Sequence, residues 1–234
     1  MGQTVSIAIE SSCRAGGVAL GLDDRLARTR PFDASARHAT QLIACLDELL
    51  VGEGLRPPDI DQIYVSAGPG SFTGLRIGIT VARTLGQTLP GARLVAVPTP
   101  QAVADNAASL PWRHLAVILD AKGDHVYVAP FTRRGDQIIP APPAVMPAKQ
   151  FLDTSPRPVL LIGEGLWHHE LAGDGVERAD EERYYPTAEG VWRVGRRLAV
   201  AGEFVDAGQV LPVYAREPEA VRLWEERHGS DETA

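Results

Sequence analysis

The chain has 234 residues, 44% of them hydrophobic and 23% charged, and a formal net charge of −7. This composition is ordinary for a soluble globular protein, and the acidic balance argues against independent binding of RNA, whose phosphates need a basic surface. Two cysteines, Cys13 and Cys45, indicate a reducing compartment rather than a disulfide scaffold. No apolar run approaches a membrane span and no signal-peptide pattern opens the chain, so we expect a cytoplasmic protein without a membrane partner.

The first half of the chain alternates short apolar runs, turns and helical periods. Glu10 ends the first apolar run, ahead of the turn SSCRAGG, and the period becomes helical at Ser35. Gly52 and Gly54 end that helix. The predicted elements, in chain order, are strands at 5–9, 18–22 and 26–30, a helix at 35–50, a strand at 63–67, a helix at 73–89, a strand at 94–97 and a helix at 98–108.

The same pattern then begins again. LAVILDAKGDHVYVAPFTRRGDQIIP mirrors IAIESSCRAGGVALGLDDRLART, with Asp120 in the place of Glu10, which predicts an internal duplication. Two copies of a βββαβα unit predict an α/β protein whose two lobes face each other across a cleft. We expect the first lobe at 1–105 and the second at 106–212, with a C-terminal helix at about 213–228 packing back on the first lobe. The later elements are a strand at 159–162, the turn GEGLWHHE, a helix at 187–201 and a last helix at 221–226.

The stretch SAGPGSFTGLRIGITVARTLGQTL, residues 66–89, organises the first lobe. A strand runs through Gly68, Gly70 and Gly74 onto the start of a helix, where Ser71 or Thr73 can cap the first turn. This arrangement is a usual way to build an anion cradle. It equally describes a tight turn whose glycines only allow close packing. Since the phosphate-loop pattern with its lysine is absent, both interpretations stay open.

The helix after this loop carries Gly78, Ala82 and Gly86 on one face, at a spacing of four. Glycine inside a helix costs about 1 kcal/mol relative to alanine, and such a ridge lets another backbone come very near. The ridge therefore predicts close packing either on the chain's own sheet or on a partner helix. The sequence does not choose between them.

The histidines do not have the spacing of a metal site. Two histidines four apart on a helix can both reach a metal, but His38 has Leu42 four residues on, and His168 and His169 are adjacent. Ser71 is not in the Gly-x-Ser-x-Gly elbow of a serine hydrolase. We therefore expect no metal site and no peptidase chemistry.

Three stretches, SAGPGSFTGLRIG, IAIESSCRAGGVAL and PVYAREPEA, resemble the TsaB family of bacterial proteins, and the resemblance spans residues 7–220. That family belongs to the machinery for threonylcarbamoyladenosine in tRNA. The resemblance implies the two-lobed fold of actin, sugar kinases and Hsp70, in which cleft carboxylates and glycine turns hold a nucleotide and its metal. The implied cleft, a vestigial nucleotide site, comprises Glu10, Ser11, Ser12, Gly68, Gly70, Ser71, Asp120, Gly163 and Gly165.

The chain also differs from the enzymes of this fold in two motifs that those enzymes use for catalysis. The first turn lacks the Asp-Gly-Thr type signature of kinases, and the His-x-x-x-His helix of the catalytic relative TsaD is missing. The resemblance thus implies a non-catalytic subunit of the complex that makes N6-threonylcarbamoyladenosine at position 37 of tRNA. The alternative is a nucleotide-binding ATPase of the same fold.

The resemblance also implies partners. The chain is expected to pair with TsaD through its first lobe, to meet the ATPase TsaE through the complex, and to form a homodimer when alone. It would contact tRNA only indirectly and hold no cofactor of its own, since ATP and metal belong to the partner subunits. The implied interface with TsaD comprises His38, Leu42, Leu46, Leu75, Gly78, Ile79, Ala82 and Gly86.

Overall fold

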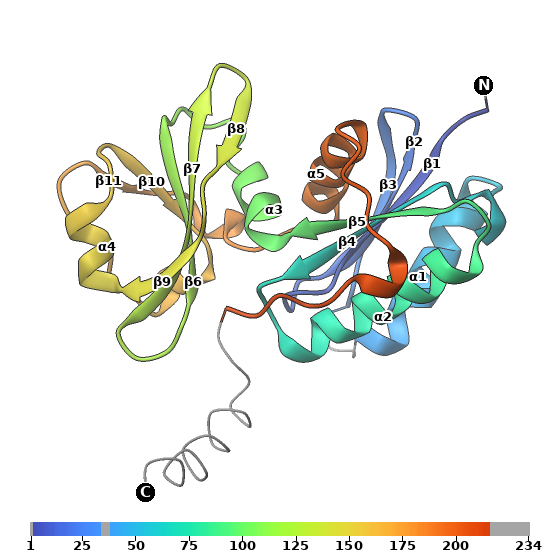
Figure 1. Cartoon of the computed structure of the whole chain (residues 1–234), viewed down its shortest axis with the longest axis horizontal. Coiled ribbons are helices and arrows are strands. Elements are labelled where there is room, and N and C mark those ends of the chain that lie inside the picture. The colour runs from blue at the N-terminus through green and yellow to red at the C-terminus, as the bar shows by residue number, and fades with distance from the viewer. Residues whose placement is uncertain (1, 34–37, 216–234) are drawn as a thin grey trace, which may run out of the picture.

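The computed structural model describes residues 2–33 and 38–215, which form two α/β lobes side by side (Figure 1). The first lobe is built on a five-stranded sheet with the strand order β3-β2-β1-β4-β5, and the second on a sheet whose main path is β11-β10-β6-β7-β8. The two-lobed α/β architecture predicted from the sequence is confirmed.

The elements of the first lobe follow the predicted order closely. They are β1 (Val5–Glu10), β2 (Gly17–Leu22), β3 (Arg25–Pro31), α1 (His38–Gly52), η1 (Pro57–Asp59), β4 (Gln62–Gly68), α2 (Phe72–Thr88), β5 (Arg93–Pro98) and α3 (Thr99–Asp105). Strand β1 lies at the centre, antiparallel to β2 and parallel to β4. Every residue of β1 and β2 is buried, as expected for strands that are covered on both faces.

The second lobe repeats the core of this topology with fewer helices. Its elements are β6 (His114–Asp120), β7 (His125–Arg134), β8 (Gln137–Pro140), β9 (Ala144–Pro147), α4 (Ala148–Thr154), β10 (Val159–Ile162), η2 (Glu164–Trp167), β11 (Val176–Arg178) and η3 (Glu181–Arg183). Strand β6 pairs antiparallel with β7 and parallel with β10, as β1 does with β2 and β4. Glu10 and Asp120 therefore end equivalent strands, which agrees with the predicted duplication.

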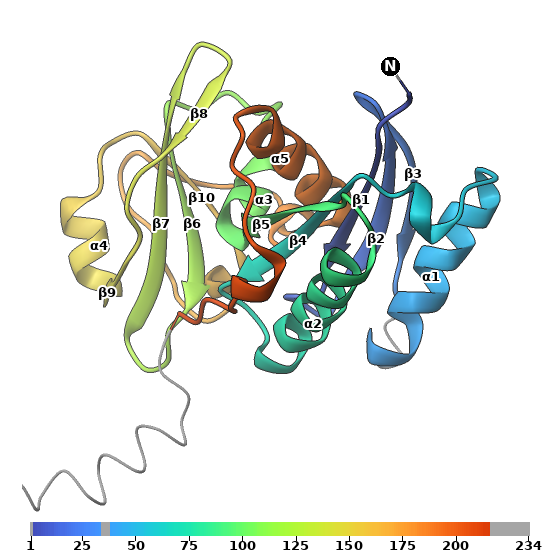
Figure 2. The same ribbon diagram turned by 45° about the vertical axis from the view of Figure 1, so that its right-hand side comes forward.

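Helix α5 (Ala188–Val200) returns to the first lobe. It covers the sheet face opposite α1 and α2 (Figure 2). Trp192 packs where Gly21 leaves room, and its Nε1 donates to Ser6 Oγ at 2.9 Å. Tyr64 packs in the same way against Gly195. The predicted second lobe at 106–212 is therefore wrong at its C-terminal end, because helical periodicity identifies an apolar face but not the sheet on which it packs.

The segment after α5 also follows the first lobe. Val205 bridges to Leu94, a short η4 (Ala207–Gln209) lies against α2, and Val213 N donates to Ala67 O at 2.7 Å. Residues 213–215 are not helical, and the rest of the helix predicted at about 213–228 lies outside the described residues. None of the helices in the described chain has the length and hydropathy needed to cross a membrane.

Candidate functional site between the lobes

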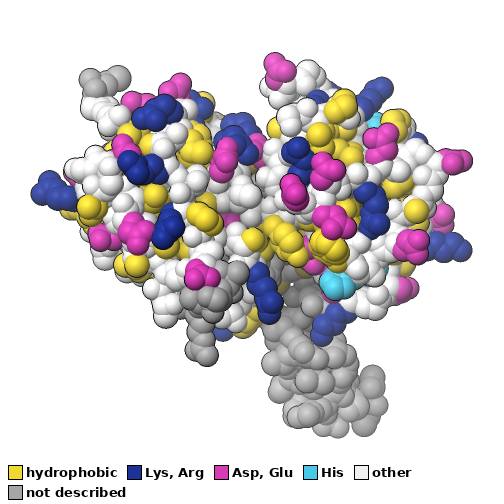
Figure 3. All heavy atoms as spheres, turned by 180° about the vertical axis from the view of Figure 1, so that it is seen from behind, with side chains coloured by type: hydrophobic (Ala, Val, Ile, Leu, Met, Phe, Trp, Pro, Cys, Tyr) yellow, Lys and Arg dark blue, Asp and Glu magenta, His cyan; other side chains and the backbone are white. Residues whose placement is uncertain are grey.

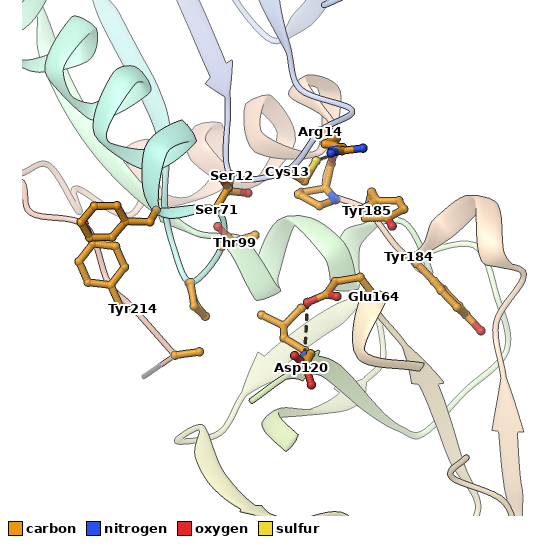
Figure 4. Close-up of a pocket in the computed structure, with 16 residues that line it drawn as sticks. Ser12, Cys13, Arg14, Ser71, Thr99, Asp120, Glu164, Tyr184, Tyr185 and Tyr214 are labelled. Atoms are coloured by element: carbon orange, nitrogen blue, oxygen red, sulfur yellow. Dashed lines mark hydrogen bonds between the residues drawn. The ribbon is translucent and has the colours of Figure 1, made fainter. Parts of the chain in front are cut away.

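A cavity of about 470 Å³ lies between the two lobes. Figure 4 shows Ser12, Ser71 and Thr99 on its first-lobe side, and Asp120 and Glu164 on the other. The complete lining is Ser12, Cys13, Arg14, Pro69, Gly70, Ser71, Phe72, Thr99, Leu119, Asp120, Glu164, Tyr184, Tyr185, Pro186, Tyr214 and Ala215. The cavity is thus built from the turn after β1, the glycine loop before α2, the end of β6 and the chain around Tyr184 and Tyr214.

The glycines of the loop and of α2 make room for the turn after β1. A Cβ at Gly70 would lie 2.6 Å from Ser12 O, and at Gly74 and Gly78 it would overlap the Ser11 carbonyl and hydroxyl oxygens. The Ser71 N–H donates to Ser12 O at 2.7 Å. These contacts account for the glycine spacing by close packing within the chain, the second of the two interpretations that the sequence allowed.

The start of α2 is also capped from within the chain. Ser71 Oγ accepts from Gly74 N at 3.3 Å, as the sequence predicted for one of two residues. Since Ser71 N is bonded to Ser12, two N–H groups of the loop and first turn already have protein acceptors. An anion at this helix start would have to compete with both.

Glu10 lies beneath the cavity rather than on its wall. Its side chain is completely buried, and its Oε1 accepts from Ser12 N at 2.5 Å and from Ser12 Oγ at 2.6 Å. Oε2 finds no hydrogen-bond partner among the described residues. Burial raises the pKa of Glu10 to about 7, although the hydrogen bonds from Ser12 act in the opposite direction. The expectation that Glu10 lines the cleft is corrected, since the carboxylate faces the turn that it supports.

Asp120 does face the cavity, and His169 holds it. Asp120 Oδ1 lies 3.1 Å from His169 Nε2 and accepts from Lys122 N at 3.2 Å. Burial would raise the pKa of Asp120, but the hydrogen bonds from His169 and Lys122 outweigh it and hold the pKa below its ordinary value. Asp120 is therefore the ionised carboxylate of the pair that the sequence singled out.

The turn after β10 supplies a second carboxylate, which the sequence analysis missed. Glu164 lines the cavity and its Oε1 accepts from Asp120 N at 3.3 Å. The neighbouring Gly163 and Gly165 were expected at the cleft, but they are the close-packing points of this turn. A Cβ on Gly163 would overlap Ile118 O, and one on Gly165 would lie 2.7 Å from Leu119 C. Glu164 directly follows β10, which pairs parallel with β6, and this pairing brings it beside Asp120.

Among the described residues, the cavity has neither a thiol poised as a thiolate nor a set of metal ligands. Burial raises the pKa of the Cys13 thiol well above its ordinary range, so the thiolate is disfavoured. Within residues 2–33 and 38–215 no group of three or more His, Cys, Asp or Glu side chains could hold a metal ion. What the arrangement offers is recognition by carboxylates, hydroxyls and aromatic rings.

The sequence model of a family described as "TsaD: tRNA N6-adenosine threonylcarbamoyltransferase" matches residues 28–207. The chain belongs to this family. It is 27% identical to the tRNA threonylcarbamoyladenosine biosynthesis protein TsaB of Bacillus subtilis, over 93% of the chain and 96% of that protein. Against TsaB of Escherichia coli the identity is 28%, over 90% and 94%. The solved structure of YeaZ from Pseudomonas aeruginosa superposes with a TM-score of 0.76 at 25% identity, covering 90% and 99% of the two chains. The resemblance to TsaB predicted from the three motifs is confirmed.

In this family member, most residues expected at a partner interface lie in the core of the first lobe. Leu42, Leu75 and Ala82 have no exposed surface, and Gly86 packs against Ala207. His38 is the first residue of α1, and its side chain lies outside the description. The other buried members of the predicted interface are Leu46, Gly78 and Ile79. The expectation that the buried side chains of this set contact a partner is therefore corrected. The apolar face of each helix packs on the sheet of its own lobe, so these side chains are not available at the surface.

The opposite sides of α1 and α2 remain exposed. Ile43 and Val51 of α1 are 56% and 66% exposed, and Phe72 at the start of α2 is 45% exposed. A shallow groove runs along α2 and is lined by Phe72, Thr73, Arg76, Ile77, Thr80 and Val81. We call the solvent-facing sides of these two helices, which carry Ile43 and Val51 on α1 and Phe72 and the groove on α2, the outer face of α1 and α2.

Proposed function

We propose that the chain is a non-catalytic subunit in the biosynthesis of threonylcarbamoyladenosine in tRNA, and that it pairs with the catalytic subunit TsaD. The observation that carries the proposal is the match over nearly the whole chain to proteins named for this pathway as TsaB. The chemistry of the interlobe cavity supports the non-catalytic part. Of the two topologically equivalent carboxylates, Glu10 is buried under the turn after β1, and only Asp120 faces the space where a nucleotide would bind.

The outer face of α1 and α2 is the surface that we propose for TsaD. A partner of the same fold could lay its own equivalent helices against it, with near two-fold symmetry. Exposed apolar side chains that gather on one face mark such sites. The same face would support a homodimer when TsaD is absent, and TsaE would join through the assembled pair.

The surface charge agrees with an indirect role toward tRNA. On the face seen in Figure 3, acidic and basic side chains are interspersed over both lobes, without a continuous basic area. The net charge of −7 points the same way. RNA binding needs clustered positive charge, so the partner would contribute most of the contacts to tRNA.

The pairing is tested with Ile43→Arg and a matched control, Val200→Arg, at a position that is 80% exposed on α5, on the opposite side of the first lobe. We expect Ile43→Arg to weaken binding to TsaD at least about 30-fold, the effect of losing a central contact of about 2 kcal/mol. Val200→Arg should bind as the wild type does. Both variants should keep the wild-type thermal midpoint, because each position is exposed. Equal affinities for the two variants, measured by calorimetry, would place the interface elsewhere.

A separate assay distinguishes the alternative function, a nucleotide-binding ATPase, from a non-catalytic subunit. A nucleotide-binding ATPase should turn over ATP, and Asp120→Asn should abolish that turnover because Asp120 is the ionised carboxylate at the cavity. For a non-catalytic subunit, wild type and Asp120→Asn have the same background rate. Turnover that Asp120→Asn removes would establish the ATPase instead.

A further inference from the structure

A second cavity, of about 500 Å³, lies between the two lobes. Leu211 and Val213 line it, whereas Tyr214 and Ala215 line the first cavity, so the segment after α5 lies between the two. The first lobe contributes the ends of β4 and β5, and the second lobe contributes β7 and the chain after β8. Pockets for small molecules lie preferentially between domains and measure about 300 to 1,000 Å³. The second cavity therefore has the position and the size of a ligand site.

The lining of the second cavity is apolar and uncharged. None of the described side chains that form it is Asp, Glu, Lys, Arg or His. Five of the lining residues are prolines, which have no backbone N–H group to donate. The first cavity differs, because Arg14, Asp120 and Glu164 line it. An ionised ligand in the second cavity would lose its hydration without gaining a counter-charge, which disfavours nucleotides and other anions there.

The second cavity also has an unused hydrogen-bond donor, the hydroxyl of Tyr127. Tyr127 is 8% exposed and lies with Ala129 and Phe131 on one face of β7, since alternate residues of a strand share a face. No hydrogen bond joins its hydroxyl to another described residue. Within that part of the chain, the fully enclosed polar atoms without a partner are Glu10 Oε2 and Ser11 Oγ, so the Tyr127 hydroxyl is open to the cavity. Burial raises the pKa of Tyr127, and the group therefore stays protonated and can donate.

We propose that the second cavity binds an uncharged, largely apolar small molecule whose acceptor oxygen, such as that of a ketone, receives a hydrogen bond from the Tyr127 hydroxyl. Such an oxygen supplies the partner that the folded chain leaves unmade at a largely buried donor. The polar groups of the lining, which include the amides of Gln101 and Gln209, are all neutral. This site is independent of the proposed pairing with TsaD, which uses the outer face of α1 and α2.

Two uncharged fluorescent probes test the proposal on the full chain. Prodan carries a ketone oxygen, whereas N-phenylnaphthylamine carries no oxygen. We expect prodan to bind saturably, with one molecule per chain and a blue-shifted emission. Tyr127→Phe keeps the ring and should weaken the binding of prodan about fivefold, the effect of losing one hydrogen bond. The same variant should bind N-phenylnaphthylamine as the wild type does.

Two tryptophan variants locate the bound probe. Ala141 and Ala144 are both exposed, but only Ala141 is part of the lining. Ala141→Trp should occupy part of the cavity and lower the affinity for both probes at least about tenfold, since less apolar surface can be buried. Ala144→Trp is the matched control and should bind both probes as the wild type does. Leu211→Trp, at a position of the lining that is 69% exposed, provides the same test if Ala141→Trp does not fold.

Three results would overturn the proposal. The first is an absence of saturable prodan binding to the wild type. The second is that neither Ala141→Trp nor Leu211→Trp binds prodan more weakly than Ala144→Trp, or that Tyr127→Phe affects the two probes equally. The third is that the anionic probe anilinonaphthalene sulfonate binds at this site as tightly as prodan, because an uncharged lining should reject a sulfonate.

Discussion

Glu10 and Asp120 hold equivalent places in the two lobes, yet their protonation is driven in opposite directions. Glu10 is fully buried, and this burial raises its pKa to about 7 despite the hydrogen bonds from Ser12. Asp120 is bonded by His169 and its pKa falls below the ordinary value. The duplicated topology therefore keeps an acidic residue at the end of both strands, but the two residues have different structural roles. Glu10 holds the turn after β1, whereas Asp120 shapes the charge of the cavity.

The raised pKa of Glu10 predicts a specific pH dependence of stability. Because the folded-state pKa of about 7 exceeds the ordinary value of 4.5, the folded state holds the proton more tightly than the unfolded state does. The resulting stability is complete below about pH 4.5 and is lost as the pH rises through about 7. At 1.36 kcal/mol per unit, the loss is about 3 kcal/mol.

Glu10→Gln should remove this loss, since an amide stays neutral and still accepts from Ser12. Urea unfolding of the wild type should therefore show a free energy of unfolding that falls between pH 5 and pH 8, relative to Glu10→Gln at the same pH values. Glu203→Gln, at an exposed position of the first lobe, should follow the wild type. If the free energy of unfolding changed with pH in the same way for the wild type and for Glu10→Gln, this account of Glu10 would be refuted.

At the scale of elements, the contact between α2 and the turn after β1 is the tightest feature of the first lobe. Gly74→Ala would drive a methyl group into the Ser11 carbonyl oxygen, which belongs to the backbone and cannot rotate away. We expect Gly74→Ala to lower the free energy of unfolding by about 3 kcal/mol, the upper part of the usual range for overpacking. The measurement is urea denaturation at constant pH.

A matched control is Gly52→Ala at the exposed end of α1. There the nearest atom to a new Cβ is Arg28 Cζ at 3.6 Å, an ordinary contact. This variant should be unchanged or stabilised by up to about 1 kcal/mol through helix propensity. If Gly74→Ala were as stable as Gly52→Ala, the glycines of α2 would not be explained by close packing.

The sequence predicted most elements because their periods are local. The helices at α1 and α2 and the strands of both sheets follow from apolar spacing and glycine or proline ends. The sequence could not predict which surfaces pack against each other, because that depends on tertiary contacts. The ridge at Gly78 was compatible with a partner or with the Ser11 turn, and only the packed structure decides where the neighbouring atoms lie. Glu164 escaped notice because its role arises from a parallel pairing between β10 and β6.

At the scale of the whole molecule, the connections at residues 106–113 and 183–187 both join the two lobes, and they are hydrogen-bonded to each other. Asn106 Nδ2 donates to Arg183 O at 3.0 Å and to Tyr185 O at 2.7 Å. Next to this junction, the buried Asp105 pairs with Arg193 and Arg197 of α5 at 2.5 and 2.9 Å. The second lobe is thus an insertion between α3 and α5, whose ends lie close together.

This arrangement predicts that the second lobe can be removed. A chain in which residues 1–108 are joined to residues 185–234 by a short Gly/Ser linker should fold, because Asn106 and Tyr185 already meet and α5 covers its sheet face. Residues 1–108 alone should aggregate, since Tyr64, Val95 and Val97 would lose the cover that Trp192 and its helix provide. Circular dichroism and Trp192 fluorescence should show one cooperative unfolding transition for the joined chain. Cooperative unfolding of residues 1–108 by themselves would show that α5 is dispensable. The domain boundary that the sequence predicted near residue 105 would then mark a complete domain.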